Sequence, residues 1–218
     1  MSSSSDSSTL TEQLSADFAA ELAPWRSPLS RALHRNRAQP FCRFLQLATV
    51  RTDGTPANRT VVFRGFLTDS NLLMFISDRR SEKIAQIQQN PPAEACWYFT
   101  KTREQFRLSG ELTVVTADTS EPSLKEARSQ LWQNISDNAR LQFAWPHPKA
   151  PRQEDVNFSP PPPDLQTPLL TFCLLLLSPH TVDHLSLRGE PQDRMLYRRV
   201  DQQLGEEDKQ WSVSNVNP

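Results

Sequence analysis

Apolar and polar residues alternate along much of the chain, and this alternation predicts many short strands. The clearest case is Gln105–Val115, in which Phe106 and Leu108 alternate with polar neighbours, so that one face is buried and the other polar. The same pattern predicts strands at Phe44–Val50, Thr60–Leu67, Leu72–Ser77, Ala93–Thr100, Phe172–Leu177, Thr181–Leu187, Arg194–Val200 and near Trp211–Val213.

Apolar residues spaced three or four apart predict helices between these strands. The expected helices run from near Thr11 to Pro24, from Pro28 to about Arg37, and over Arg80–Asn90, Ser123–Asn134 and Asp137–Phe143. Many short strands interrupted by a few helices indicate an α+β fold with a Greek-key barrel.

Two of the predicted strands, Thr60–Leu67 and Leu72–Ser77, flank a polar turn at Asp69–Asn71, which is typical of a hairpin. A hairpin would bring Arg59, before the first strand, close to Ser81 and Lys83, after the second. A guanidinium, an ammonium and a hydroxyl together suit a phosphate monoester. The alternative is that these are ordinary solvated charges at strand ends, and the pattern alone leaves both interpretations open.

The length of 218 residues fits one domain, which we place at 11–218 behind a serine-rich tail, 1–10, that we expect to be disordered. Residues 149–168 contain four consecutive prolines and are expected to form a stiff surface loop rather than a docking motif. The basic residues of the Pro28–Arg37 helix are expected to be a solvated surface rather than a nucleic-acid patch.

Charge and cysteine content narrow the function classes. A net charge of −1 gives no global attraction to nucleic acid or anionic membranes, so a phosphate site would have to be local. Three widely spaced cysteines and four histidines show no ligand spacing, and we expect no metal. The apolar run Leu169–Leu177 is about half the ~20 residues of a membrane span, so we expect a buried strand and a soluble, cytoplasmic protein.

Three segments in order, 59–83, R-E-Q-F-R-L-S-G at Arg103–Gly110 and D-R-M-L-Y at Asp193–Tyr197, resemble the FMN-binding split-barrel family of pyridoxamine 5'-phosphate oxidase. They are closer to its oxidase-related branch than to the authenticated oxidases, and the resemblance runs from about Phe18 to Pro218. It implies a six-stranded antiparallel split barrel with peripheral helices. It also implies a homodimer with FMN in the groove between subunits.

The resemblance further implies a set of cofactor-binding residues. Arg59, Ser81 and Lys83 match residues that bind the flavin phosphate, and Arg64 stands where the oxidases have a lysine that touches cofactor and substrate. Arg194 matches an arginine of the opposite subunit. The full implied set is Arg59, Thr60, Val61, Val62, Arg64, Ser77, Ser81, Lys83, Gln105, Arg107 and Arg194.

The chain departs from the oxidase pattern at several positions. On the flavin side, Glu82 replaces an arginine and Leu185 a tryptophan, and Arg80 could supply the missing charge. On the substrate side, Ser136 stands at an arginine position, Arg140 at a serine position, and Glu190-Pro191-Gln192 at an R-x-H. The sequence therefore predicts that the cofactor half is kept and the vitamin-substrate half is lost.

Three functions follow from this resemblance. The favoured one is an FMN-dependent oxidoreductase of unknown substrate. The others are a genuine pyridoxamine or pyridoxine 5'-phosphate oxidase and a non-enzymatic flavin- or haem-binding barrel. Because a flavin would carry the redox chemistry, the sequence identifies no catalytic acid or base.

Overall fold

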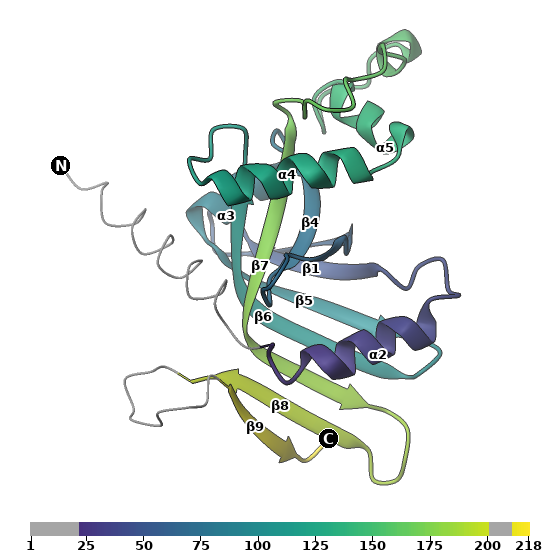
Figure 1. Ribbon diagram of the computed structural model, residues 1–218, viewed down its shortest axis with the longest axis vertical. Helices are drawn as coiled ribbons and strands as arrows, with labels where there is room; N and C mark the ends of the chain where they lie inside the picture. The colour runs from purple at the N-terminus through teal and green to yellow at the C-terminus, as the bar shows by residue number, and fades with distance from the viewer. Residues whose placement is uncertain (1–21, 201–210) are drawn as a thin grey trace, which may run out of the picture.

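The computed structural model describes residues 22–200 and 211–218 (Figure 1). The serine-rich tail and the helix expected from Thr11 lie outside these residues. Four described α-helices are α2 (Arg26–Asn36), α3 (Glu82–Gln89), α4 (Pro122–Asn134) and α5 (Asp137–Leu141). Two short 3₁₀ turns follow, η1 (Gln142–Ala144) and η2 (Asp155–Phe158), the second within the proline-rich loop.

Nine strands of the described chain form one antiparallel sheet with the order β2-β1-β5-β6-β7-β4-β3, while β8 pairs with β7 and β9 with β8. The α+β antiparallel fold is thus confirmed, with nine strands rather than six. The strands are β1 (Phe44–Val50), β2 (Pro56–Val62), β3 (Gly65–Phe66), β4 (Leu73–Asp78), β5 (Pro92–Phe99), β6 (Glu104–Val115), β7 (Phe172–Ser186), β8 (Asp193–Arg199) and β9 (Trp211–Val216).

The predicted hairpin between Thr60–Leu67 and Leu72–Ser77 forms only next to its turn, and the rest of its first strand pairs elsewhere. Strand β2 ends at Val62 and pairs with β1, and only the two residues of β3 pair with β4. Residues 63 and 64 separate the two strands, and β3 begins at Gly65, whose φ of +127° a residue with a side chain rarely adopts. Strands β2 and β3 are therefore opposite edges of the sheet joined by two residues, so the sheet must curl, and this curl brings Arg59 near Lys83.

Strand β7 is a single 15-residue strand where the sequence predicts two. The proline at its middle, Pro179, makes a break in the strand the simpler expectation, because proline cannot donate to a ladder. In the structure the register shifts between Ser109 and Gly110, and Pro179 lies opposite Gly110 at this irregularity. The strand therefore bends at the proline and continues.

The first half of β7 divides two hydrophobic cores. Cys173, Leu175 and Leu177 point into the barrel core, which α2 closes with Trp25 and Leu29. The alternate residues Phe172, Leu174 and Leu176 belong to a second core with Leu124, Leu131 and Trp132. Helix α4 lies across β7 and β4 (Figure 1). The run Leu169–Leu177 is thus mostly buried strand, as predicted, and none of the described helices is long and apolar enough to span a membrane.

The bend in β7 gives a test of the fold. A Cβ on Gly110 would lie 2.0 Å from the backbone oxygen of Ser178, so that the two strands would have to separate. We expect Gly110→Ala to lower the free energy of unfolding by about 3 kcal/mol, measured by urea denaturation. Glu111→Ala, at the exposed neighbouring position, should change it by less than about 0.5 kcal/mol. A Gly110→Ala protein with the wild-type midpoint would contradict the close approach.

Candidate functional site

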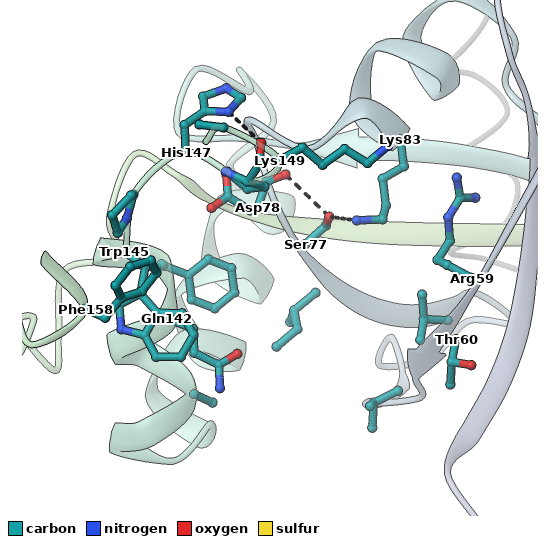
Figure 2. Close-up of a pocket in the computed structure, with 18 of the residues that line it drawn as sticks. Arg59, Thr60, Ser77, Asp78, Lys83, Gln142, Trp145, His147, Lys149 and Phe158 are labelled. Carbon is teal, nitrogen blue, oxygen red and sulfur yellow. Dashed lines mark hydrogen bonds between the residues drawn. The ribbon is translucent and has the colours of Figure 1, made fainter. Parts of the chain in front are cut away.

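A cavity of about 670 Å³ opens where the barrel closes (Figure 2). One wall is β2, the second is the junction of β4 and α3, and the third is the segment from α5 into the proline-rich loop. Seven of the predicted site residues line it, namely Arg59, Thr60, Val61, Val62, Arg64, Ser77 and Lys83. Ser81 lines a neighbouring hollow of about 540 Å³, which also has Arg59 and Lys83 in its wall.

The Lys83 ammonium is held by two hydroxyls. Its Nζ donates to Ser77 Oγ and to Ser81 Oγ, both at 3.0 Å, and the two hydroxyl oxygens are 3.2 Å apart. Ser81 precedes the first residue of α3, yet its side chain makes no capping bond and is turned to Lys83 instead. Burial, followed by the nearby Arg59 charge, lowers the pKa of Lys83.

The Arg59 guanidinium is held by neutral oxygens of β1 and α3. Its Nη1 donates to Thr49 Oγ1 at 2.6 Å and its Nη2 to Gln86 Oε1 at 3.0 Å, and Thr49 Oγ1 itself donates to Gln86 Oε1 at 2.7 Å. Sequence reasoning missed these two supports. A signal was present, because Thr49 and Gln86 are polar residues at inward positions of β1 and α3, where apolar residues are expected.

Arg59 and Lys83 are thus two partly buried cations that no carboxylate of the described chain pairs directly. Burial, and then the charge of Arg51, lowers the pKa of Arg59. Uncompensated charge in a partly desolvated place is costly unless an anion arrives to balance it. The arrangement is therefore suited to bind a doubly charged anion such as a phosphate monoester.

The suggestion that Arg80 replaces the missing phosphate arginine is not supported by its contacts. Its Nε donates to Asp78 Oδ1 at 3.0 Å, its Nη2 to Asp78 Oδ2 at 2.6 Å, and its Nη1 to the Trp145 carbonyl at 3.0 Å. Arg80 therefore neutralises Asp78 and ties the α5–loop segment to β4. In doing so it removes a negative charge from the cavity that holds Lys83.

Two donors in the cavity wall have no partner. Arg64 Nε and Trp145 Nε1 are buried and make no hydrogen bond. Trp25 Nε1 and Arg26 Nε, from residues that do not line this cavity, are also buried without a hydrogen bond. The fit of a phosphorylated molecule such as FMN therefore rests on Arg59 and Lys83.

Gln105, Arg107 and Arg194 do not line this cavity. They lie on the outer face of the sheet, where Gln105 pairs with Leu185 and Leu185 with Arg194 across β6, β7 and β8. Arg107 and Arg194 both contact Asp183, at 3.8 and 2.7 Å, and Arg107 also pairs with Glu94 at 2.8 Å. These three predicted site residues form a separate group within one chain.

The substrate-side positions are occupied by structural contacts. Ser136 Oγ accepts from the Ala139 N–H and caps α5. Arg140 is only 5% exposed and donates to the carbonyls of Trp132, Gln133 and Ile135, which end α4. Arg188 donates to the Lys101 carbonyl at 2.6 Å, in a different hollow. None of the three lines the cavity around Arg59.

The curled antiparallel sheet and its cationic cavity define a split-barrel flavoprotein. Residues 22–116 match the family model described as pyridoxamine 5'-phosphate oxidase, FMN-binding domain. The chain is 35% identical over 198 residues to pyridoxine/pyridoxamine 5'-phosphate oxidase 2 of Arabidopsis thaliana. This alignment covers 90% of this chain and 98% of that protein. The chain therefore belongs to the pyridoxamine 5'-phosphate oxidase-like FMN-binding family, and its cofactor is FMN.

Solved structures agree with this assignment. A pyridoxamine 5'-phosphate oxidase-related, FMN-binding protein from Nostoc punctiforme is 56% identical and has a TM-score of 0.86, covering 91% of this chain and 100% of its own. PhzG from Burkholderia lata has a TM-score of 0.69 over 93% of this chain and 96% of its own, at 17% identity, and shows the same fold. The family resemblance and the split-barrel fold predicted from sequence are thus confirmed.

The lowered pKa of Lys83 gives a pH-dependent test. The unfolded chain binds this proton more tightly than the folded apo-protein does, so between the folded pKa and the ordinary value of 10.5 the stability should rise with pH. We expect urea unfolding of the apo-protein to show this rise, and Lys83→Met to flatten it while weakening FMN binding. Lys125→Met, on the exposed side of α4, is the control. A Lys83→Met protein with the wild-type pH profile would contradict the burial cost.

Proposed function

We propose that the protein is an FMN-dependent oxidoreductase whose principal substrate is not pyridoxamine 5'-phosphate. The observation that carries the proposal is the contrast between the cavity around Arg59 and the positions that bind substrate in the oxidases. The cavity presents two partly buried, unpaired cations, Arg59 and Lys83. The family's substrate positions on α5 are instead committed to helix capping.

The chain's own residues would bind and orient the flavin. Arg59 and Lys83 would hold the phosphate, and the extended residues Thr60–Val62 would lie along the ring system. Arg64 and Trp145 would form part of the cavity wall beside the flavin. When bound, FMN supplies the two-electron redox chemistry. The proline-rich segment from Pro146 to Pro151 would limit the access of water.

We further propose that the complete site is composite and lies in a C2 homodimer. Arg194 lies on the outer face of β8, bound to Asp183, and does not line the cavity that holds Arg59, so the two side chains of one chain do not share a ligand. The outer face between them carries Phe44 and Tyr98, large apolar residues that are 48% and 44% exposed. A second copy that covers this face would bring its Gln105 and Arg194 to the first copy's cavity.

The substrate argument rests on charge. Ser136 has no charge to offer a phosphate ester, and Arg140 is enclosed by carbonyl groups at the end of α4. Glu190 and Gln192 stand in an exposed turn with Arg103 and Arg188. Each missing charge-assisted contact to phosphate costs about 1.5–3 kcal/mol of binding. We therefore propose a substrate that is not held through a phosphate at α5.

A second candidate function is the oxidation of pyridoxamine or pyridoxine 5'-phosphate. It is favoured by the name of the Arabidopsis relative, which aligns with nearly the whole chain.

Haem, which the sequence left open as an alternative ligand, gains no support because the matching domain is an FMN-binding one. We also propose a reducing, cytosolic location, since Cys42, Cys96 and Cys173 are all free thiols.

The composite site predicts complementation between subunits. We expect Arg59→Ala and Arg194→Ala homodimers each to bind FMN about tenfold more weakly or worse. A heterodimer of the two variants, purified through two tags, should regain one wild-type site per dimer. A heterodimer of wild-type and doubly substituted chains is the matched control and should have none. One intact site in the control and none in the mixed dimer would show that each chain holds its own complete site.

The substrate proposal predicts slow turnover of pyridoxamine 5'-phosphate. Two lost phosphate contacts should lower kcat/KM by about 10²–10⁴ relative to an authentic oxidase. The measurement is steady-state oxidation under air by FMN-loaded protein, with the authentic enzyme assayed alongside. A kcat/KM within tenfold of that enzyme would contradict the proposal and establish the second candidate.

A further inference from the structure

Glu82 places a negative charge beside the cations that are assigned to the flavin phosphate. It is the first residue of α3, between Ser81 and Lys83, and it lines the smaller hollow together with Arg59. The hydrogen bond from Lys149, followed by the positive charges around it, holds the pKa of the Glu82 carboxyl below its usual value. A charged carboxylate at this position would oppose a phosphate dianion unless a cation balances it.

The proline-rich loop supplies that cation. Lys149 Nζ lies 2.5 Å from Glu82 Oε2, although the two residues are 67 positions apart. Lys149 has a φ of +64° and stands among Pro146, Pro148 and Pro151, which restrict the path of the loop. Figure 2 shows its side chain extending from the loop toward Lys83. Lys149 lines both the main cavity and the smaller hollow, as do Arg59 and Lys83.

Lys149 offsets the negative charge of Glu82 by direct contact, next to the two cations assigned to the phosphate. Arg59 and Lys83 contribute two positive charges and Glu82 removes one, which leaves +1. Lys149 raises the sum over these residues to +2, whereas a phosphate monoester carries about −1.5 to −2 at neutral pH. Arg51, at the rim of the hollow, donates to neutral oxygens of Thr55 and Pro56 and keeps its charge, which adds to the positive field without contacting Glu82 directly. Asp78 is neutralised by Arg80.

We propose that Lys149 is a cofactor-positioning residue, which neutralises Glu82 and so completes the positive charge that faces the FMN phosphate. The proposal rests on the assignment of FMN to this cavity and adds the proline-rich loop to its binding site. It explains how the chain keeps a phosphate site with an acidic residue in the first turn of α3. The loop would therefore contribute to cofactor affinity and not merely cover the cavity.

The test is a four-protein FMN titration followed by flavin fluorescence at low ionic strength, where an exposed ion pair is least screened. Removing the lysine alone leaves Glu82 uncompensated, so Lys149→Ala should bind FMN about fivefold more weakly, the upper range for an exposed pair. Removing the carboxylate alone leaves an extra cation, so Glu82→Gln should bind about fivefold more tightly. The double variant should bind within about twofold of the wild type, because the net charge is restored.

Two controls separate charge from loop disruption. Riboflavin, which lacks the phosphate, should bind all four proteins alike, and Lys125→Ala should leave the FMN affinity unchanged. The proposal is overturned if Lys149→Ala binds FMN like the wild type, if the double variant is as weak as Lys149→Ala, or if riboflavin affinity falls in parallel. A wild-type protein that fails to bind FMN would instead overturn the cofactor assignment itself.

Discussion

The long strand β7 is the constraint on which the rest of the structure depends. Its first half is buried on both faces and divides the barrel core from the core under α4. The same half pairs with β4, where Cys173 lies opposite Ser77, and so positions the hydroxyl that holds Lys83. Its second half, beyond the bend at Pro179, pairs with β8 and so positions Arg194, a β8 residue, on the outer face. One strand thereby fixes both halves of the proposed composite site, which is why the tight fit of Gly110 against Ser178 matters for function as well as for stability.

Partial burial of two cations in the cavity lowers the stability of the apo-protein and raises its affinity for an anion. Arg59 and Lys83 are partly removed from water, and burial lowers the pKa of both. The charge of Arg51 lowers the pKa of Arg59 further, and the charge of Arg59 lowers that of Lys83. Their hydrogen-bond partners are neutral hydroxyl, amide and carbonyl oxygens. Neutral partners orient the cations without cancelling their charge, so the charge is left for a ligand. Carboxylates near the cavity are neutralised by other residues, Asp78 by Arg80 and Glu82 by Lys149. The site is therefore organised for an anion before the anion binds.

Local patterns in the sequence were sufficient for most elements, whereas the connections between them were not. The period of two in β6 and the helical spacing of α4 predict these elements to within a residue or two, because their burial is one-sided. The hairpin is shorter than predicted because the chain leaves β2 after Val62 and enters the opposite sheet edge at Gly65, which is a property of barrel closure rather than of local pattern. Seven of the predicted site residues line one cavity, but Thr49, Gln86 and Lys149 were not identified, since their roles depend on contacts between distant segments.

The central claim is that Arg59 and Lys83 form a site for the phosphate of FMN, and a comparison of FMN with riboflavin tests it most directly. The two ligands share the same ring system and differ in the phosphate. Titration of the apo-protein with each, for the wild type and for Arg59→Ala, should show FMN binding at least about 10²-fold more tightly in the wild type. Most of that preference should disappear in Arg59→Ala, with riboflavin affinity little changed. Equal affinity of the wild-type protein for FMN and riboflavin would contradict the claim.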